Sequence, residues 1–259
     1  MGRVASRDGT AIAYERTGSG PALILVGGGL DDGSENAPLM PELAGSFTVC
    51  NYARRGRAES GDTPPYAVER EIEDIHALVA EAGGSAHLYG VSSGGALALE
   101  AAAAGVAVGR VAVYELPYAT TDEALRRWRE YLSRLSAALA EDRRGDALEL
   151  FMRMAGSSEE GVEGARRSAA WPGLEALAHT LAYDAACLGD GLPPVKRLAT
   201  IAQPVLVLTG GGDDFFERAA DAVATALPRA ERRVLAGEQH VADPKAVAPV
   251  LADFLAPGS

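Results

Sequence analysis

Short runs of consecutive hydrophobic residues recur along the chain, separated by stretches in which hydrophobic residues return every three or four positions. Residues 22–26 form one such run, which is typical of a strand buried on both faces of a sheet. Strands that alternate with helices predict crossover connections and a mostly parallel sheet. The predicted strands are residues 10–16, 22–26, 47–51, 86–89, 110–114, 204–209 and 233–236, and the predicted helices are residues 36–43, 68–81, 93–104, 216–227 and 243–255.

One long stretch, residues 119–191, interrupts this alternation. It carries no strand pattern, and its hydrophobic residues follow helical spacing. We therefore expect an α/β core domain formed by residues 1–118 and 192–259, with an all-helical insertion at residues 119–191 between two strands of the sheet. The clearest helical series in the insertion is Leu125, Trp128, Leu132, Leu135 and Leu139.

The overall charge argues against several classes of partner. The 259 residues include 24 Lys and Arg against 36 Asp and Glu, a net charge of −12, which disfavours nucleic acid and anionic membranes as partners. Residues 1–10 lack the apolar segment of a secretion signal, and no apolar stretch is long enough to cross a bilayer. Cys50 and Cys187 are expected to be free thiols, and the scattered histidines predict no metal site. We therefore expect a cytoplasmic protein whose partner is a small-molecule substrate.

A serine flanked by glycines provides the strongest chemical signal. The pattern Gly-x-Ser-x-Gly, centred on Ser92, follows a predicted strand and opens a predicted helix. A serine at such a turn projects its hydroxyl from the top of the sheet, where it can act as a nucleophile. The alternative is a serine that only caps the helix. The glycine clusters match neither a dinucleotide-binding fingerprint nor a phosphate-binding loop, so nucleotide binding is not expected.

The order of these features is similar to that of the α/β-hydrolase superfamily over almost the whole chain. A Gly-rich loop at residues 27–29 follows an early strand, the serine turn follows a middle strand, and the helical segment follows the next strand. The resemblance implies an α/β-hydrolase fold in which residues 119–191 form a cap. It also implies the catalytic order serine, acid, histidine along the chain.

His240 is the expected general base, because it lies in a loop after the last predicted strand and is the last histidine of the chain. Three carboxylates are candidates for the acid that orients its imidazole. Asp213 is preferred, since it follows the penultimate strand through three glycines and resembles the family's Gly-x-x-Asp segment. Its neighbour Asp214 is the first alternative. Glu115, which follows an earlier strand, is the second.

The resemblance also suggests where the oxyanion hole lies. One donor is expected to be the backbone N–H of Ser93, and the other that of Gly29 or of Gly28. Gly27 occupies the position of a histidine that is common in this loop of the family. A second loop, residues 52–60, resembles the family's Arg-Gly segment, and solvated side chains are the preferred interpretation of its arginines. These are Arg54, Arg55 and Arg57.

The expected function is that of a serine hydrolase. Ser92 would attack the carbonyl of a small to medium apolar ester, thioester or lactone, and water would resolve the acyl-enzyme with no cofactor or metal. Two alternatives stay open: an enzyme that performs C–C cleavage, lyase or cyclisation chemistry with the same triad, and a ligand-binding protein on a hydrolase fold. Four large side chains of the insertion are candidates for the substrate pocket, and packing of cap against core is the alternative for each. They are Trp128, Phe151, Met152 and Trp171.

Overall fold

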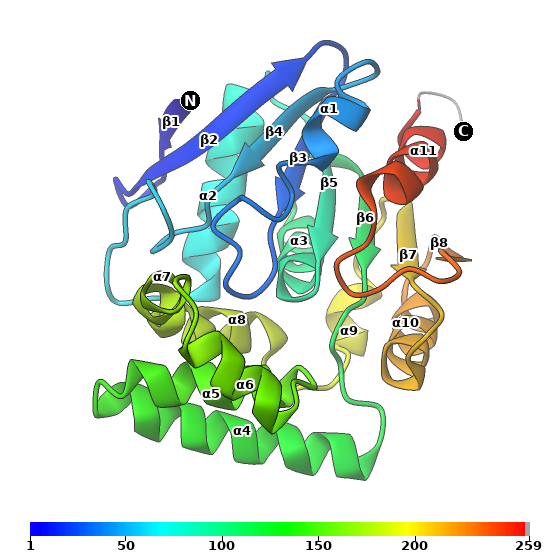
Figure 1. Ribbon diagram of the computed structural model, residues 1–259. Helices are drawn as coiled ribbons and strands as arrows, with labels where there is room; N and C mark the ends of the chain where they lie inside the picture. The colour runs from blue at the N-terminus through cyan, green and yellow to red at the C-terminus, as the bar shows by residue number, and fades with distance from the viewer. Residues whose placement is uncertain (257–259) are drawn as a thin grey trace.

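The computed structural model describes residues 1–256, which form an eight-stranded sheet in the order β1-β2-β4-β3-β5-β6-β7-β8 (Figure 1). β2 pairs antiparallel with β1 and with β4, and all the other neighbours pair in parallel. The predicted mostly parallel sheet is therefore confirmed. The strands are β1 (Gly2–Ala5), β2 (Ala11–Gly18), β3 (Ala22–Val26), β4 (Thr48–Tyr52), β5 (Ala86–Val91), β6 (Val108–Tyr114), β7 (Val205–Thr209) and β8 (Ala230–Val234).

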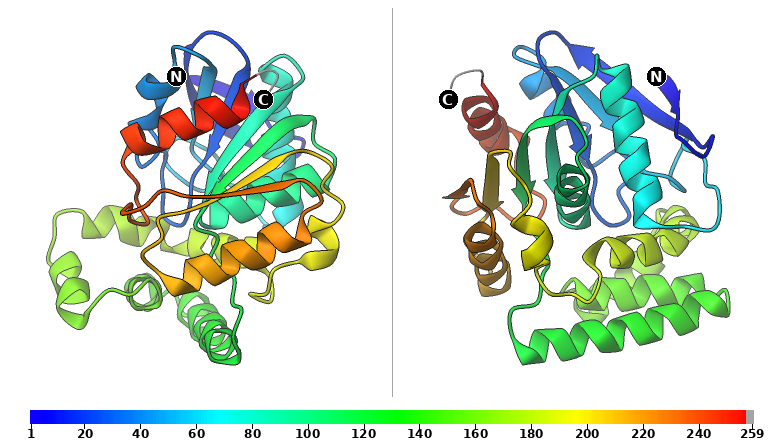
Figure 2. Two further views of the ribbon diagram at one scale, coloured as in Figure 1. Left: turned by 90° about the vertical axis from the view of Figure 1, so that its right-hand side faces the viewer. Right: turned by 180° about the vertical axis from the view of Figure 1, so that it is seen from behind.

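Helices cover both faces of this sheet (Figure 2). Three helices pack against one face and two against the other, and each face belongs to its own hydrophobic cluster. The first group is α2 (Val68–Glu81), α3 (Ser93–Ala103) and α10 (Asp214–Ala226). The second group is α1 (Leu39–Leu43) and α11 (Pro244–Leu255).

The two clusters explain why the strand signals are unbroken hydrophobic runs. Successive side chains of a strand point to opposite faces, so a strand covered on both sides is apolar at every position. In β3, Ile24 and Val26 lie in the cluster with α2 and α3, whereas Leu23 and Leu25 lie in the cluster with α1 and α11. All four side chains are fully buried.

The helical insertion lies between β6 and β7 in the chain and beside the carboxyl ends of the parallel strands (Figure 1). Its presence confirms the prediction from the helical spacing. Near the end of the insertion, a short 3-10 turn separates two consecutive helices. The elements are α4 (Asp122–Ala140), α5 (Arg144–Met154), α6 (Glu159–Arg166), α7 (Trp171–Leu177), η1 (Ala178–Thr180), α8 (Leu181–Leu188) and α9 (Val195–Leu198).

The edges of the sheet differ from the prediction. β8 begins at Ala230, earlier than the predicted strand at residues 233–236, and β1 was not predicted. Both are edge strands with exposed and charged side chains, so they lack the hydrophobic run on which the prediction depended. Cys50 and Cys187 are free and buried, as predicted. None of the helices within residues 1–256 has the length and hydrophobicity needed to cross a membrane.

We expect Leu251→Ala to lower the free energy of unfolding by about 2–5 kcal/mol, because the side chain is fully buried between α11 and the sheet. Val195→Ala is the matched control. Val195 is 57% exposed, so its truncation should change stability by no more than about 0.5 kcal/mol. Urea denaturation of both variants measures the difference. Equal losses in the two variants would show that α11 is not part of the core.

Candidate active site

Ser92 lies at the turn between β5 and α3. Its backbone has φ 55° and ψ −125°, a combination that a non-glycine residue rarely adopts. Although Ser92 occupies the position of a helix cap, its hydroxyl makes no capping hydrogen bond to α3. The alternative of a serine that only caps the helix is therefore wrong. Strained backbone of this kind is characteristic of functional sites.

The glycines of the Gly-x-Ser-x-Gly pattern allow this turn to pack tightly. A Cβ atom at Gly90 would lie 2.5 Å from the carbonyl oxygen of Gly94. A Cβ atom at Gly94 would collide with the carbonyl oxygens of Val26 and Gly27. Only glycine fits at both positions, so the turn brings Ser92 close to the Gly-rich loop after β3.

His240 lies in the loop between β8 and α11. Its Nδ1 lies 2.7 Å from Oε2 of Glu115, within hydrogen-bonding distance. The ring of Phe216 stacks on the imidazole, with the ring centroids 4.9 Å apart. The side chain of His240 is 43% exposed, so the imidazole is held on two sides and still accessible to a substrate.

Glu115 is the buried partner of this pair, with a side chain that is only 5% exposed. It follows β6 directly, and its backbone has φ 48°, the second unusual positive value at the ends of neighbouring strands. Its Oε1 accepts a hydrogen bond from the backbone N–H of Gly210, 3.1 Å away, at the end of β7. Both carboxylate oxygens therefore have a partner, as a buried carboxylate requires.

The preferred prediction for the acid, Asp213, is corrected by this geometry. Asp213 caps α10, and its side chain accepts a hydrogen bond from the N–H of Phe215 at 2.7 Å. The side chain of Asp214 is 92% exposed, and its Oδ2 lies 3.4 Å from Nη1 of Arg218. The first of the three glycines before Asp213 has another role, since a Cβ atom at Gly210 would collide with the carbonyl oxygen of Glu238 in the loop that carries His240. The second alternative, Glu115, is the carboxylate that meets the imidazole.

Tyr114 connects the three segments of the site. Its carbonyl oxygen accepts a hydrogen bond from the N–H of Ser92 at 2.9 Å. Its hydroxyl donates to the carbonyl oxygen of Gln239 at 2.6 Å. The end of β6 therefore holds the serine turn through Tyr114. It holds the histidine loop through both Tyr114 and Glu115.

The Gly-rich loop lies against the serine turn, where the resemblance places the oxyanion hole. A Cβ atom at Gly28 would lie 3.2 Å from Cβ of Ser92. The hydrogen bonds made within residues 1–256 leave the N–H groups of Gly28 and Gly29 without an acceptor. The N–H of Ser93 begins α3 and has no acceptor within the helix. Of the three expected donors, Gly28 and Ser93 thus lie directly beside Ser92, and Gly29 follows Gly28 in the loop.

The prediction of solvated arginines in the loop after β4 is wrong. Their side chains are at most 1% exposed, and each is paired with a carboxylate. Sequence reasoning also missed Asp184 of α8, whose Oδ1 accepts hydrogen bonds from two of these arginines. Its only signal is an acidic residue within an otherwise apolar helix. The three arginines are Arg54, Arg55 and Arg57.

The four candidate pocket residues occupy different environments. Phe151 of α5 is partly exposed, and its ring would lie 3.1 Å from a Cβ atom at Gly29. Trp128 is buried and donates a hydrogen bond to the carbonyl oxygen of Gly189 inside the insertion. Trp171 is buried too, whereas Met152 is partly exposed. Phe151 thus lies against Gly29 of the Gly-rich loop.

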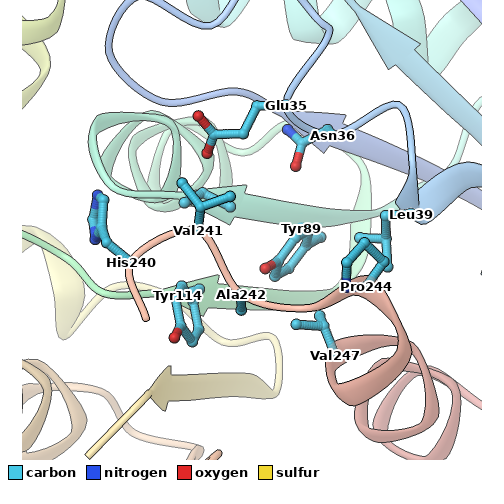
Figure 3. Close-up of a pocket in the computed structure, with 11 residues that line it drawn as sticks. Glu35, Asn36, Leu39, Tyr89, Tyr114, His240, Val241, Ala242, Pro244 and Val247 are labelled. Atoms are coloured by element: carbon cyan, nitrogen blue, oxygen red, sulfur yellow. The ribbon is translucent and has the colours of Figure 1, made fainter. Parts of the chain in front are cut away.

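A small cavity lies beside the imidazole of His240 (Figure 3). Its volume is about 30 Å³, room for about one or two water molecules and too little for an ester substrate. The Glu35 carboxyl lines it, and burial raises the pKa of that carboxyl. The other lining residues are Asn36, Leu39, Tyr89, Val91, Tyr114, Val241, Ala242, Pro244 and Val247.

Comparison with known proteins agrees with this architecture. A solved structure of an alpha/beta hydrolase from Sphaerobacter thermophilus DSM 20745 is 46% identical, with a TM-score of 0.89 over 98% of this chain and 100% of that one. A thermophilic esterase from Thermogutta terrifontis is 23% identical and has the same fold, with a TM-score of 0.73 over 98% of this chain and 97% of that one.

A shorter match exists to a hydrolase of Bacillus subtilis (strain 168), named "Uncharacterized hydrolase YraK". It is 35% identical over 96 residues, which are 36% of this chain and 35% of that protein. Residues 22–250 match the model of a family described as "Alpha/beta hydrolase family". That range includes the Gly-rich loop, the serine turn, the insertion and the histidine loop, so the chain belongs to the alpha/beta hydrolase family.

Proposed function

We propose that the protein is a serine hydrolase that cleaves a small to medium apolar ester, thioester or lactone through an acyl-enzyme. The observation that carries the proposal is the hydrogen bond between His240 and the buried Glu115. This pair lies at the end of β6, the strand whose last residue also holds the backbone of Ser92. A nucleophile, a base and an acid that orients the base are the parts that acyl transfer requires.

In the proposed reaction, Ser92 Oγ forms a bond to the substrate carbonyl carbon while its proton moves to His240. The Nδ1 of His240 is engaged by Glu115, so Nε2 is the nitrogen that exchanges this proton. The N–H groups of Ser93 and Gly29 stabilise the oxyanion. The bond to the leaving alcohol or thiol then breaks, and that group takes the proton from His240.

Water completes the cycle by the same steps in the second half-reaction. Water attacks the acyl carbon and gives a proton to His240. The bond between the acyl carbon and Ser92 Oγ then breaks, which releases the carboxylic acid product, and His240 returns the proton to Ser92. Every step uses side chains and backbone of this chain, so the proposal includes no cofactor or metal. The helical insertion, as the proposed cap, limits access of water and selects the acyl group.

We expect a fluorophosphonate probe to attach to Ser92, because the probe reacts with a serine that a histidine activates. Ser92→Ala should abolish the labelling. Peptide mass spectrometry identifies the labelled residue. Label on Ser93 in place of Ser92, or no label on a folded wild-type protein, would contradict the proposed nucleophile.

The carboxylates can be compared by amide substitution. Glu115→Gln should lower kcat by up to about 10⁴, as expected when the imidazole loses the acceptor that fixes its tautomer. Asp213→Asn and Asp214→Asn are matched controls and should keep kcat within about 3-fold, since both carboxylates are exposed. Steady-state hydrolysis of a 4-nitrophenyl ester measures all three variants. A larger loss in Asp213→Asn than in Glu115→Gln would restore Asp213 as the acid.

Phe151→Ala should change selectivity for the acyl chain, because the ring lies against the oxyanion loop. Removing it should shift the ratio of kcat/KM between long and short 4-nitrophenyl esters toward the longer chains, by about 10- to 200-fold at most. Trp128→Phe is the control, since Trp128 is buried within the insertion and should alter stability without altering that ratio. An unchanged ratio in Phe151→Ala would remove Phe151 from the pocket.

A further inference from the structure

The guanidinium of Arg57 contacts backbone carbonyl groups of the Gly-rich loop and of the residues that follow it. Its Nη1 donates hydrogen bonds to the carbonyl oxygen of Gly28 and to that of Asp31, the latter at 3.1 Å. Its Nη2 donates to Oδ1 of Asp184 at 2.8 Å. The Arg57 side chain is fully buried, so its guanidinium cannot move without breaking these contacts.

These contacts fix the orientation of the peptide between Gly28 and Gly29. In a planar trans peptide, the C=O of one residue and the N–H of the next point in opposite directions. The guanidinium of Arg57 lies on the C=O side of this peptide. The N–H of Gly29 therefore points away from Arg57 and remains available to the oxyanion.

The second oxyanion donor is tied to the same carboxylate. Oδ1 of Asp184 accepts a hydrogen bond from the hydroxyl of Ser93 at 2.8 Å. The same oxygen accepts from Nη1 of Arg54 at 2.6 Å. One oxygen atom from α8 of the insertion thus connects to Ser93 directly and to the Gly28–Gly29 peptide through Arg57.

The cluster is balanced in charge. Arg54 and Arg57 face Glu71 and Asp184, two cations against two anions. Burial alone would raise the pKa of Asp184, but Arg57 and Arg54 outweigh it and hold that pKa below its ordinary value. Asp184 is therefore ionised at neutral pH, and the cluster adds no net charge beneath the oxyanion loop.

We propose that Arg57 and Asp184 are positioning residues for the oxyanion hole, through which the helical insertion holds the Gly29 and Ser93 donors in place. This inference rests on the proposed function, because it concerns the same oxyanion. Neither side chain touches the substrate. Their effect is on the direction of two backbone N–H groups, and an error of about 1 Å in such a position can cost about 10²-fold in rate.

Arg55 provides a matched control in the same loop. Its side chain is as buried as that of Arg57, and it is paired with Asp74 at 2.6 Å and with Asp8 at 2.9 Å. Its remaining hydrogen bond goes to the carbonyl oxygen of Arg70 in α2. None of these partners belongs to the Gly-rich loop, so Arg55→Gln removes a buried ion pair and leaves the hydrogen bonds of Arg57 and Asp184 intact.

The kinetic test compares Arg57→Gln and Arg55→Gln on a 4-nitrophenyl ester, with rates referred to the folded fraction. Arg57→Gln should lower kcat about 10- to 100-fold with KM within about 3-fold. It should also weaken inhibition by benzeneboronic acid, whose tetrahedral adduct occupies the oxyanion hole, by a similar factor. Arg55→Gln should keep kcat and inhibition within about 3-fold. Equal losses in the two variants would overturn the proposal.

The Asp184 variants test the link to the insertion. Asp184→Asn keeps an oxygen at the position of Oδ1 and should retain kcat within about 10-fold, whereas Asp184→Ala should match Arg57→Gln. Arg57→Lys serves as a second variant if Arg57→Gln does not fold, since it keeps the charge but cannot reproduce all three hydrogen bonds. Asp184→Ala with wild-type kcat would overturn the proposal.

Amide hydrogen exchange separates this proposal from the proposed function. Exchange of the peptide covering residues 26–33 should accelerate at least about 10-fold in Arg57→Gln and remain as in the wild type in Arg55→Gln. This measurement needs no substrate. A wild-type protein that takes no label at Ser92 would contradict the proposed function, whereas unchanged exchange in Arg57→Gln would contradict the positioning role alone.

Discussion

Buried charge is the constraint on which the arrangement of the site depends. Three arginines of one loop are almost completely removed from water, and an unpaired buried guanidinium would cost several kcal/mol. Their partners come from separate parts of the chain. α2 supplies two carboxylates, α8 supplies a third, and Asp8 before β2 supplies a fourth. The Gly-rich loop supplies the carbonyl oxygens of Gly27 and Gly28. These groups must meet for the arginines to be buried, so the helical insertion is held against the same loop that borders Ser92.

The end of β6 has a comparable role on the other side of Ser92. Tyr114 holds the backbone of Ser92 and that of Gln239, and Glu115 holds the imidazole of His240. A central parallel strand is rigid because it is bonded on both sides, here to β5 and β7. Glu115 and the groups that hold Ser92 and the His240 loop therefore lie at the end of one central strand, so the sheet sets their relative positions.

Local patterns predicted much of this fold, and their failures have a common cause. The buried strands and the turn at Ser92 are encoded within a few neighbouring residues, as hydrophobic runs and close-packed glycines. The carboxylate that contacts His240 is not encoded in this way, because Asp213 and Glu115 both follow strands and only the path of the histidine loop selects between them. The contact between Arg54 and Asp184 joins residues 130 positions apart. A local sequence pattern cannot show such a distant partner, so it favoured solvated side chains for arginines that are buried in ion pairs.

Two residues of the site, Ser92 and Glu115, have strained backbone that the neighbouring strands hold in place. Ser92 and Glu115 both have positive φ, which costs about 1–3 kcal/mol each in a non-glycine residue. Each is held by a backbone hydrogen bond to the neighbouring strand end, from Ser92 to Tyr114 and from Glu115 to Leu208. The charges of Arg54 and Arg57 balance those of Glu71 and Asp184. In the proposed reaction, a developing oxyanion would therefore be stabilised by oriented N–H dipoles. Such dipoles act only when their direction is fixed before the reaction. In the proposed mechanism, the strained turn and the buried ion pairs fix that direction.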